Sequence, residues 1–162
     1  MATLISLSSN DTEYVTVRSK FISGGLSGAR IHSIIKITMP DDVTSKHENF
    51  KKSYSASGVL TLYHGTKHCC DITKLSDFTR LCQNITCGVC GIIRTGPRPN
   101  GFVWFGPSSD ISHGYTGAIG IMAGSFRAIF VMDVVSATSS HGAYTVPHGE
   151  AALPRYLIIY SH

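Results

Sequence analysis

The chain has 162 residues, enough for one domain and too few for two. Hydrophobic residues make up 43% of it and charged residues 15%, which supports a buried core and excludes a disordered chain or a coiled coil. The net charge of +4 suits an anionic ligand such as a dinucleotide or RNA. Because the basic residues are scattered along the sequence, nucleic acid is a partner that the sequence allows but does not indicate.

The sequence contains no apolar stretch of about 18 residues, the length that a bilayer crossing needs. Its start lacks the basic residues and the long apolar run of a signal peptide. We therefore expect an intracellular protein, cytoplasmic or nuclear, with no membrane partner. In such a reducing compartment the cysteines are not expected to form structural disulfides.

The first part of the chain predicts short strands and one helix. Residues 14–17 alternate in polarity as a strand does, and residues 31–37 form an apolar run that Pro40 ends. Residues 43–53 are typical of a short helix with a polar face, and residues 59–63 of a strand. This strand leads directly into a His-Gly-Thr sequence.

Residues 67–100 contain every cysteine of the chain and little periodicity, so we expect a long loop insertion with a fold of its own. A loop of this length needs something that pins it. Residues 102–105 predict a strand, and residues 108–123 predict a helix that a Ser/Asp cap opens. Further strands are expected at residues 126–135, 143–146 and 155–160. Together these elements predict a single α+β domain over residues 1–162.

The cysteines have the spacing of a metal site. Cys82, Cys87 and Cys90 follow the pattern C-x4-C-x2-C, and Cys70 lies twelve residues before the first of them. Four thiolates bind zinc in a tetrahedral structural site that leaves no open position for water. Zinc would also pin the loop, because metal binding contributes folding free energy. Buried free thiols or a disulfide are the alternatives.

The first zinc ligand stays open at this point. Cys70 is our choice, but Cys69 and His68 lie directly before it. Each of the three side chains offers a ligand atom that zinc accepts.

A second group of residues predicts a pocket for a planar ring. His64 and Gly65 stand at the end of a predicted strand, where a histidine can point into a cleft and a glycine lets a ligand approach the backbone. Trp104 is followed by Ser112 and Tyr115, which would share one face of a helix. An aromatic wall, a hydroxyl and a pair of backbone amide groups suit a ring that bears a carboxamide.

In their order along the chain, these motifs resemble the catalytic domain of poly(ADP-ribose)-polymerase-type ADP-ribosyltransferases. Residues 31–37, 62–66, 82–95, 102–115 and 149–160 carry the resemblance, which covers most of the chain. The cysteine segment among them is similar to that of short fungal members of the family. The resemblance implies the family's split two-sheet α+β fold, with a zinc-pinned loop over the donor side.

The resemblance also implies an NAD site, with roles for individual residues. Its members would be His64, Gly65, Thr66, Trp104, Ser112 and Tyr115. His64 would bind the ribose next to nicotinamide and Tyr115 would stack on the ring, so these two are the candidate catalytic residues. Gly65 and Ser112 would hold the carboxamide, and Trp104 stands where the family usually has a tyrosine. Arg94, Arg98 and Lys67 would either meet the NAD diphosphate or lie in solvent.

One position departs from the family pattern. Where the family has its catalytic glutamate, counting back from Glu150, this sequence has Ala143. The loss of a positioned general base costs about 10²–10⁴-fold in rate, which makes polymer elongation improbable. Glu150 is expected as an exposed turn residue rather than as a substitute.

The resemblance therefore implies a mono-ADP-ribosyltransferase or an NAD glycohydrolase. Either would cleave the nicotinamide–ribose bond of NAD and pass ADP-ribose to an unknown acceptor or to water. One alternative is an inactive protein that binds NAD, ADP-ribose or a partner. Another is a repurposed transferase that acts on an RNA-linked or adenylate-containing substrate.

Overall fold

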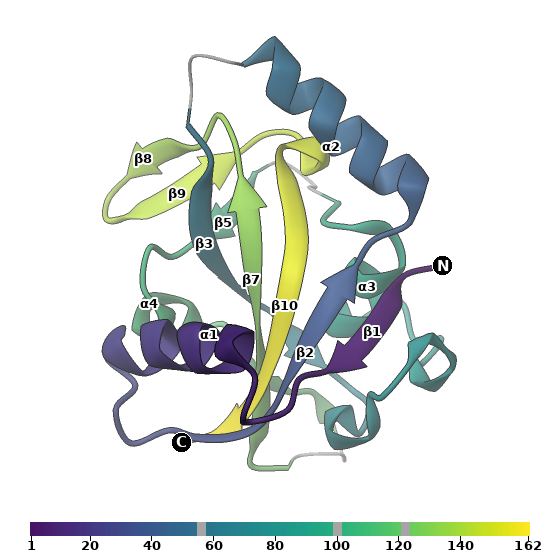
Figure 1. Ribbon diagram of the computed structural model, residues 1–162, viewed down its shortest axis with the longest axis vertical. Coiled ribbons are helices and arrows are strands. Elements are labelled where there is room, and N and C mark those ends of the chain that lie inside the picture. Colours follow the sequence, from purple (N-terminus) through teal and green to yellow (C-terminus); the bar gives the residue numbers. More distant parts are fainter. Residues whose placement is uncertain (55–57, 99–101, 121–123) are drawn as a thin grey trace.

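The computed structural model describes residues 1–54, 58–98, 102–120 and 124–162 (Figure 1). Its centre is a five-stranded sheet in the order β1-β2-β10-β7-β3, in which every neighbouring pair is antiparallel. The strands are β1 (Thr3–Ser6), β2 (Arg30–Thr38), β3 (Leu60–Gly65), β7 (Phe126–Val134) and β10 (Ala152–Ser161).

A smaller sheet lies beside the central one. It is built from β5 (Val103–Phe105), β9 (Ala143–Val146) and β8 (Thr138–Ser140), all antiparallel. Backbone hydrogen bonds between Tyr63 and Gly106, 2.9 and 2.8 Å long, connect β3 to the end of β5. A short parallel pair joins β4 (Lys67–His68) to β6 (Gly117–Ala118). The predicted α+β class is thus confirmed.

Helices and 3-10 turns cover these sheets. They are α1 (Thr12–Ser23), α2 (Asp41–Ser53), α3 (Gly88–Thr95) and α4 (Ser109–His113), with η1 (Ile72–Lys74), η2 (Phe78–Arg80) and η4 (Gly149–Ala151). In Figure 1, α1 lies across one face of the central sheet and α3 lies behind the other. None of the helices in these described parts combines the length and the apolar character that a membrane crossing requires.

The central sheet is buried on both faces, so it separates two apolar clusters. Ile34 and Ile158 point to the α1 side and pack around Phe21. Their neighbours Ile35 and Leu157 point to the opposite side, where α3 and the cysteine segment cover them. This burial of successive residues on opposite faces explains why Ile34 and Ile35 of β2 and residues 156–160 of β10 are consecutive apolar residues in the sequence.

Most of the predicted elements are present, with end residues that differ by a few positions. The helix predicted at residues 43–53 is α2, and the strands predicted at residues 31–37, 59–63, 102–105, 126–135, 143–146 and 155–160 correspond to β2, β3, β5, β7, β9 and β10. The strands β1 and β8 were not predicted, because each is short.

The strand predicted at residues 14–17 is wrong, because these residues belong to α1. Tyr14, Val17 and Phe21 follow one another at spacings of three and four, and all pack into the same apolar cluster. Val15 is apolar but 51% exposed, so the alternation of polarity over residues 14–17 does not follow the buried and exposed positions of the structure. The helical period therefore decides the structure, although four residues taken alone resemble an alternating strand.

The helix predicted at residues 108–123 is largely wrong. Among residues 108–120, which the structure describes, the single α-helix is α4, five residues long with Ser108 as its N-cap and Gly114 as its C-cap. The chain then turns into β6, where Gly117 has a φ of +124°, a backbone conformation that ends any helix. The last part of the prediction, residues 121–123, lies outside the described residues.

The segment predicted as a loop at residues 67–100 has more regular structure than expected, through residue 98. It contains β4, two 3-10 turns and α3. The α3 helix buries Val89, Ile92 and Ile93 against the central sheet. This helix was not predicted, because Cys90 within it and its N-cap Cys87 were taken only as metal ligands. Residues 99 and 100 lie outside the described residues.

Candidate functional site

A cavity of about 920 Å³ lies between β3, β5, α3 and α4. It is lined by every residue predicted for the nicotinamide pocket, namely His64, Gly65, Thr66, Trp104, Ser112 and Tyr115. These residues come from separate parts of the chain, so their meeting is a property of the fold. The loop between the second and third cysteines of the cluster also forms part of the wall.

His64 stands at the cavity edge with one ring nitrogen engaged. Its Nδ1 lies 2.8 Å from the carbonyl oxygen of Trp104, and because a carbonyl only accepts, Nδ1 is the donor. Burial lowers the pKa of His64, and the hydrogen bond to Trp104 opposes this shift. The imidazole is therefore neutral at pH 7 and retains Nε2 as a hydrogen-bond acceptor.

Gly65 is required by packing. A Cβ atom at this position would lie 2.1 Å from the carbonyl oxygen of Ser112, far inside van der Waals contact. On the Cβ side of Gly65, α4 fills the space. The predicted approach of a ligand to the Gly65 backbone stays a prediction. Gly65 nevertheless lines the cavity.

Ser112 is buried, and its hydroxyl donates to the carbonyl oxygen of Tyr63 at 2.9 Å. Its single proton is thereby used, and its oxygen is left as an acceptor. An amide N–H of a ligand matches that oxygen, whereas a ligand carbonyl does not.

Aromatic side chains form the rim of the cavity. Tyr115 is 66% exposed, Phe102 62% and Trp104 51%. The prediction that Tyr115 shares a helix face with Ser112 is wrong, because α4 ends before Tyr115. The backbone N–H of Tyr115 instead donates to the Ser112 carbonyl oxygen. Both side chains still line the same space, so the pocket forms through a turn rather than through a helix.

The segment that carries Tyr115 is held by two cations. Lys67 Nζ donates to the carbonyl oxygen of Thr116 at 2.6 Å, and Arg127 donates to the same oxygen at 3.2 Å. Thr116 is fully buried. Lys67 thus has a structural partner and does not line the cavity, which decides against its predicted contact with a diphosphate.

The charged lining of the cavity is basic. Arg94 and Arg98 line it, and no carboxylate does so among the described residues. Ala143, at the start of β9, lies in the wall, and Glu150 is an exposed residue of η4 outside it, as expected. A guanidinium N–H of Arg94 donates to the carbonyl oxygen of Cys82 at 2.5 Å, so the cavity wall is tied to the cysteine segment.

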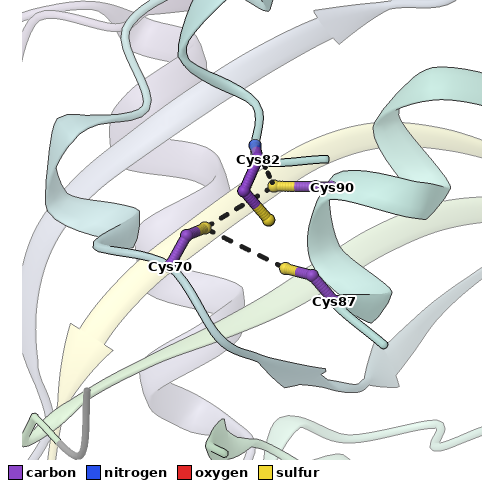
Figure 2. A group of neighbouring side chains, drawn as sticks. All are labelled: Cys70, Cys82, Cys87 and Cys90. Atoms are coloured by element: carbon purple, nitrogen blue, oxygen red, sulfur yellow. Dashed lines mark hydrogen bonds between the residues drawn. The ribbon is translucent and has the colours of Figure 1, made fainter. Parts of the chain in front are cut away.

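Four cysteines converge beside the cavity (Figure 2). The sulfur atoms of Cys70, Cys82, Cys87 and Cys90 all lie within 4.8 Å of one another. Cys70 Sγ is 3.9 Å from Cys87 Sγ and 3.6 Å from Cys90 Sγ. In a tetrahedral site with metal–sulfur bonds of about 2.3 Å, the sulfur atoms are about 3.8 Å apart. The four cysteines therefore can hold a metal ion.

The structure also answers which residue completes the group. It is Cys70, and within the described parts of the chain neither Cys69 nor His68 belongs to the group. The Cys87 sulfur stands at the N-cap of α3 and Cys90 in its first turn, so the helix sets the position of both. The backbone N–H of Cys82 donates to Cys90 Sγ at 3.4 Å, a contact that stabilises sulfur as a thiolate.

The thiols in this cluster cannot all ionise without a cation. The hydrogen bond from Cys90 lowers the pKa of Cys87, and the same bond, with burial, raises the pKa of Cys90. Burial followed by the nearby Cys87 charge raises the pKa of Cys70. A Cys87 with a lowered pKa beside Cys70 and Cys90 with raised pKa values is an arrangement in which a divalent cation can replace protons.

A scan of the chain against protein-family models and a search of the curated proteins both find no match. The resemblance to the ADP-ribosyltransferases thus stays a prediction from the motifs. The function is inferred from the chemistry of the cavity and of the cysteine cluster.

Proposed function

We propose that the cavity binds NAD and that the chain transfers one ADP-ribosyl group from NAD to an acceptor or to water. The observation that carries this proposal is the meeting of six motif residues in one cavity. Arginine is the only charged residue type in the described lining, which suits the diphosphate of a dinucleotide. We propose with it the split two-sheet fold of the ADP-ribosyltransferases.

Each cavity residue has a role in this proposal. His64 accepts a hydrogen bond from a ribose hydroxyl at Nε2. Ser112 accepts from the carboxamide N–H, and Tyr115, with its exposed ring, stacks on nicotinamide. Thr66 and Trp104 complete the wall. Aromatic stacking and hydrogen bonds hold the leaving group while the ribose develops positive charge.

The missing carboxylate defines what the site does not do. Ala143 offers no base to an acceptor, and elongation of a polymer would need one. We therefore propose single transfer. The expected reaction rate is about 10²–10⁴-fold lower than that of a site with a positioned base.

We further propose that the four cysteines hold a structural zinc ion. Four thiolates fill the tetrahedron, so the ion would supply folding free energy and no catalysis. Through Cys82 and the Arg94 side chain it would fix the cavity wall. Loss of the metal is thus expected to disturb NAD binding indirectly.

The test of the proposed function uses the single tryptophan of the chain as its probe. Trp104 lines the cavity, so addition of NAD should change its fluorescence, and released nicotinamide is measured by chromatography. His64→Ala should abolish release. His32→Ala is the matched control, because His32 is exposed on β2 and does not line the cavity.

The lack of a carboxylate favours one rival, a protein that binds NAD without turnover. A fluorescence change with no nicotinamide release would support that rival. If millimolar NAD causes neither a fluorescence change nor nicotinamide release, the proposal and its rival are both contradicted.

A further inference from the structure

The turn that carries Tyr115 has a flexible backbone and little packing of its own. Gly114 precedes Tyr115 directly and Gly117 follows two residues later, and the space around Gly114 is open where a Cβ atom would stand. Glycine loses more backbone freedom than other residues when a segment becomes ordered. The Tyr115 ring is 66% exposed, so side-chain packing does little to hold it. The placement of this ring therefore depends on the contacts that anchor the two ends of the turn.

These two ends are bonded to each other. Thr116, whose carbonyl oxygen accepts from Lys67 and Arg127, forms one end. The other end is His113, the last residue of α4. The His113 carbonyl oxygen accepts from the backbone N–H of Thr116 at 3.1 Å and from its hydroxyl at 2.7 Å. The turn is thus closed, with Tyr115 inside it.

Tyr160 gives His113 a fixed partner in the core. The Tyr160 hydroxyl lies 2.6 Å from His113 Nδ1. Tyr160 belongs to β10 in the central sheet and is fully buried, and its ring packs edge-on against Phe21 with 4.9 Å between the ring centres. A hydrogen bond to a side chain held in this way fixes the turn relative to the central sheet.

Both partners are uncharged at neutral pH. Burial lowers the pKa of His113, and the nearby Arg127 and His162 lower it further. Burial raises the pKa of Tyr160. The imidazole is therefore neutral and the phenol keeps its proton, so a neutral hydrogen bond joins them. The loss of such a bond changes an equilibrium about fivefold.

We propose that the pair of His113 and Tyr160 positions the Tyr115 ring for its stack on nicotinamide, an inference that rests on the proposed function. Within the described residues, the lining of the cavity includes neither member of the pair. They are positioning residues, which act on the ligand only through Tyr115. A turn that is already held in one arrangement loses less conformational freedom when NAD binds, so the affinity for NAD is higher.

The test compares two tyrosines of the same strand. Tyr160→Phe removes the hydroxyl that bonds to His113 and retains the ring in the core. Tyr156→Phe is the matched control, because its hydroxyl also bonds to an ionisable side chain, that of Glu13. Neither residue of this second pair belongs to the turn or lines the cavity. Chemical denaturation measures what each lost hydrogen bond costs in stability.

Titration calorimetry with NAD and with ADP-ribose separates positioning from folding. ADP-ribose lacks nicotinamide, so its binding does not use the stack. Tyr160→Phe should bind NAD about fivefold more weakly than the wild type and ADP-ribose equally well. Tyr156→Phe should bind both ligands as the wild type does. Unchanged NAD affinity in Tyr160→Phe, or an equal loss for NAD and ADP-ribose, would overturn the proposal.

A double-mutant cycle tests whether the pair acts through Tyr115. In a Tyr115→Ala protein, Tyr160→Phe should leave the NAD affinity unchanged, because no ring is left to position. Additive losses would overturn the proposal. The side-chain amide of His113→Asn can take the place of Nδ1 as a partner of the hydroxyl, so this variant should bind NAD more tightly than His113→Ala. Equal affinities of these two variants would contradict the role of the hydrogen bond.

Amide hydrogen exchange reports on the turn without a ligand. The backbone N–H groups of Tyr115 and Thr116 donate within the turn. Both should exchange about fivefold faster in Tyr160→Phe and at the wild-type rate in Tyr156→Phe. Unchanged exchange in Tyr160→Phe would overturn the inference and leave the proposed function intact. If the wild type binds no NAD, the role of the ring falls with the proposed function, and faster exchange in Tyr160→Phe would then retain only the support of the turn.

Discussion

The cysteine cluster and the cavity proposed to bind NAD lie side by side but depend on different information. The cluster needs four side chains of one type, and three of them lie within nine residues, from Cys82 to Cys90. The cavity needs five side chains of different types, and the backbone of Gly65, from the β3, β5 and α4 regions. A cluster of this kind has one evident chemistry, whereas a cavity acquires its chemistry only through the exact set of groups that meet there. The difference teaches that spacing identifies a metal site better than it identifies a ligand pocket.

The largest effect is expected on the cluster side. Cys90→Ser should remove the bound metal and destabilise the domain by about 3 kcal/mol or more, which lowers the melting temperature by about 6–12 °C. Elemental analysis measures the metal content, and thermal unfolding measures the melting temperature. Cys69→Ser, outside the group, should retain the metal and cost less than about 1 kcal/mol. Equal metal loss in both variants would contradict the assignment of Cys70.

Two glycines of the cavity wall sharpen the comparison, since they differ in the space around them. Gly65→Ala should destabilise the fold by about 1–3 kcal/mol, because its Cβ would meet the Ser112 carbonyl. Gly91→Ala should stabilise it by about 0.5–1 kcal/mol, because α3 is helical there and no atom lies within 4 Å. Chemical denaturation of the two variants measures both signs. A stable Gly65→Ala protein would refute the packing of α4 against β3.

The next effect belongs to the cavity alone. Tyr115→Ala should weaken NAD binding about tenfold, because one aromatic stack contributes about 1–3 kcal/mol. The free energy of unfolding should change by less than about 0.5 kcal/mol, since the ring is 66% exposed. Quenching of Trp104 fluorescence gives the affinity. If Tyr115→Ala binds NAD with unchanged affinity, the stacking role of Tyr115 is contradicted.

The smallest effect is a pH dependence of the cavity that the cluster should not share. Burial lowers the pKa of His64, so its ring stays neutral down to below about pH 6.5. NAD affinity should be constant from about pH 8 to 6.5 and fall at lower pH, as Nε2 gains a proton and ceases to accept. His64→Gln, which does not titrate, should lack this fall. An affinity that rises toward acid pH would contradict the role of His64 Nε2 as a hydrogen-bond acceptor.

Much of the fold was predictable because its signals are local. The strands β2, β7 and β10 each contain consecutive apolar residues at their centres, since both faces of the central sheet are buried there. The helix α1 was missed because four residues around Val15 resemble a strand when the longer period is ignored. The helix predicted from Ser108 was too long, because a turn at Gly114 and pairing with β4 compete with helix extension.

The sequence by itself determined which residue types were present and how they were spaced: a group of thiols, a His-Gly-Thr strand end, and an alanine where the resemblance leads us to expect a carboxylate. Only the tertiary structure decided that Cys70 completes the cluster, and that Ser112 donates to Tyr63. It alone also brought Tyr160 to within hydrogen-bond distance of His113. The physical reason is distance along the chain: a spacing within one segment is set by local geometry, whereas a contact between remote segments exists only once the sheets and helices have packed.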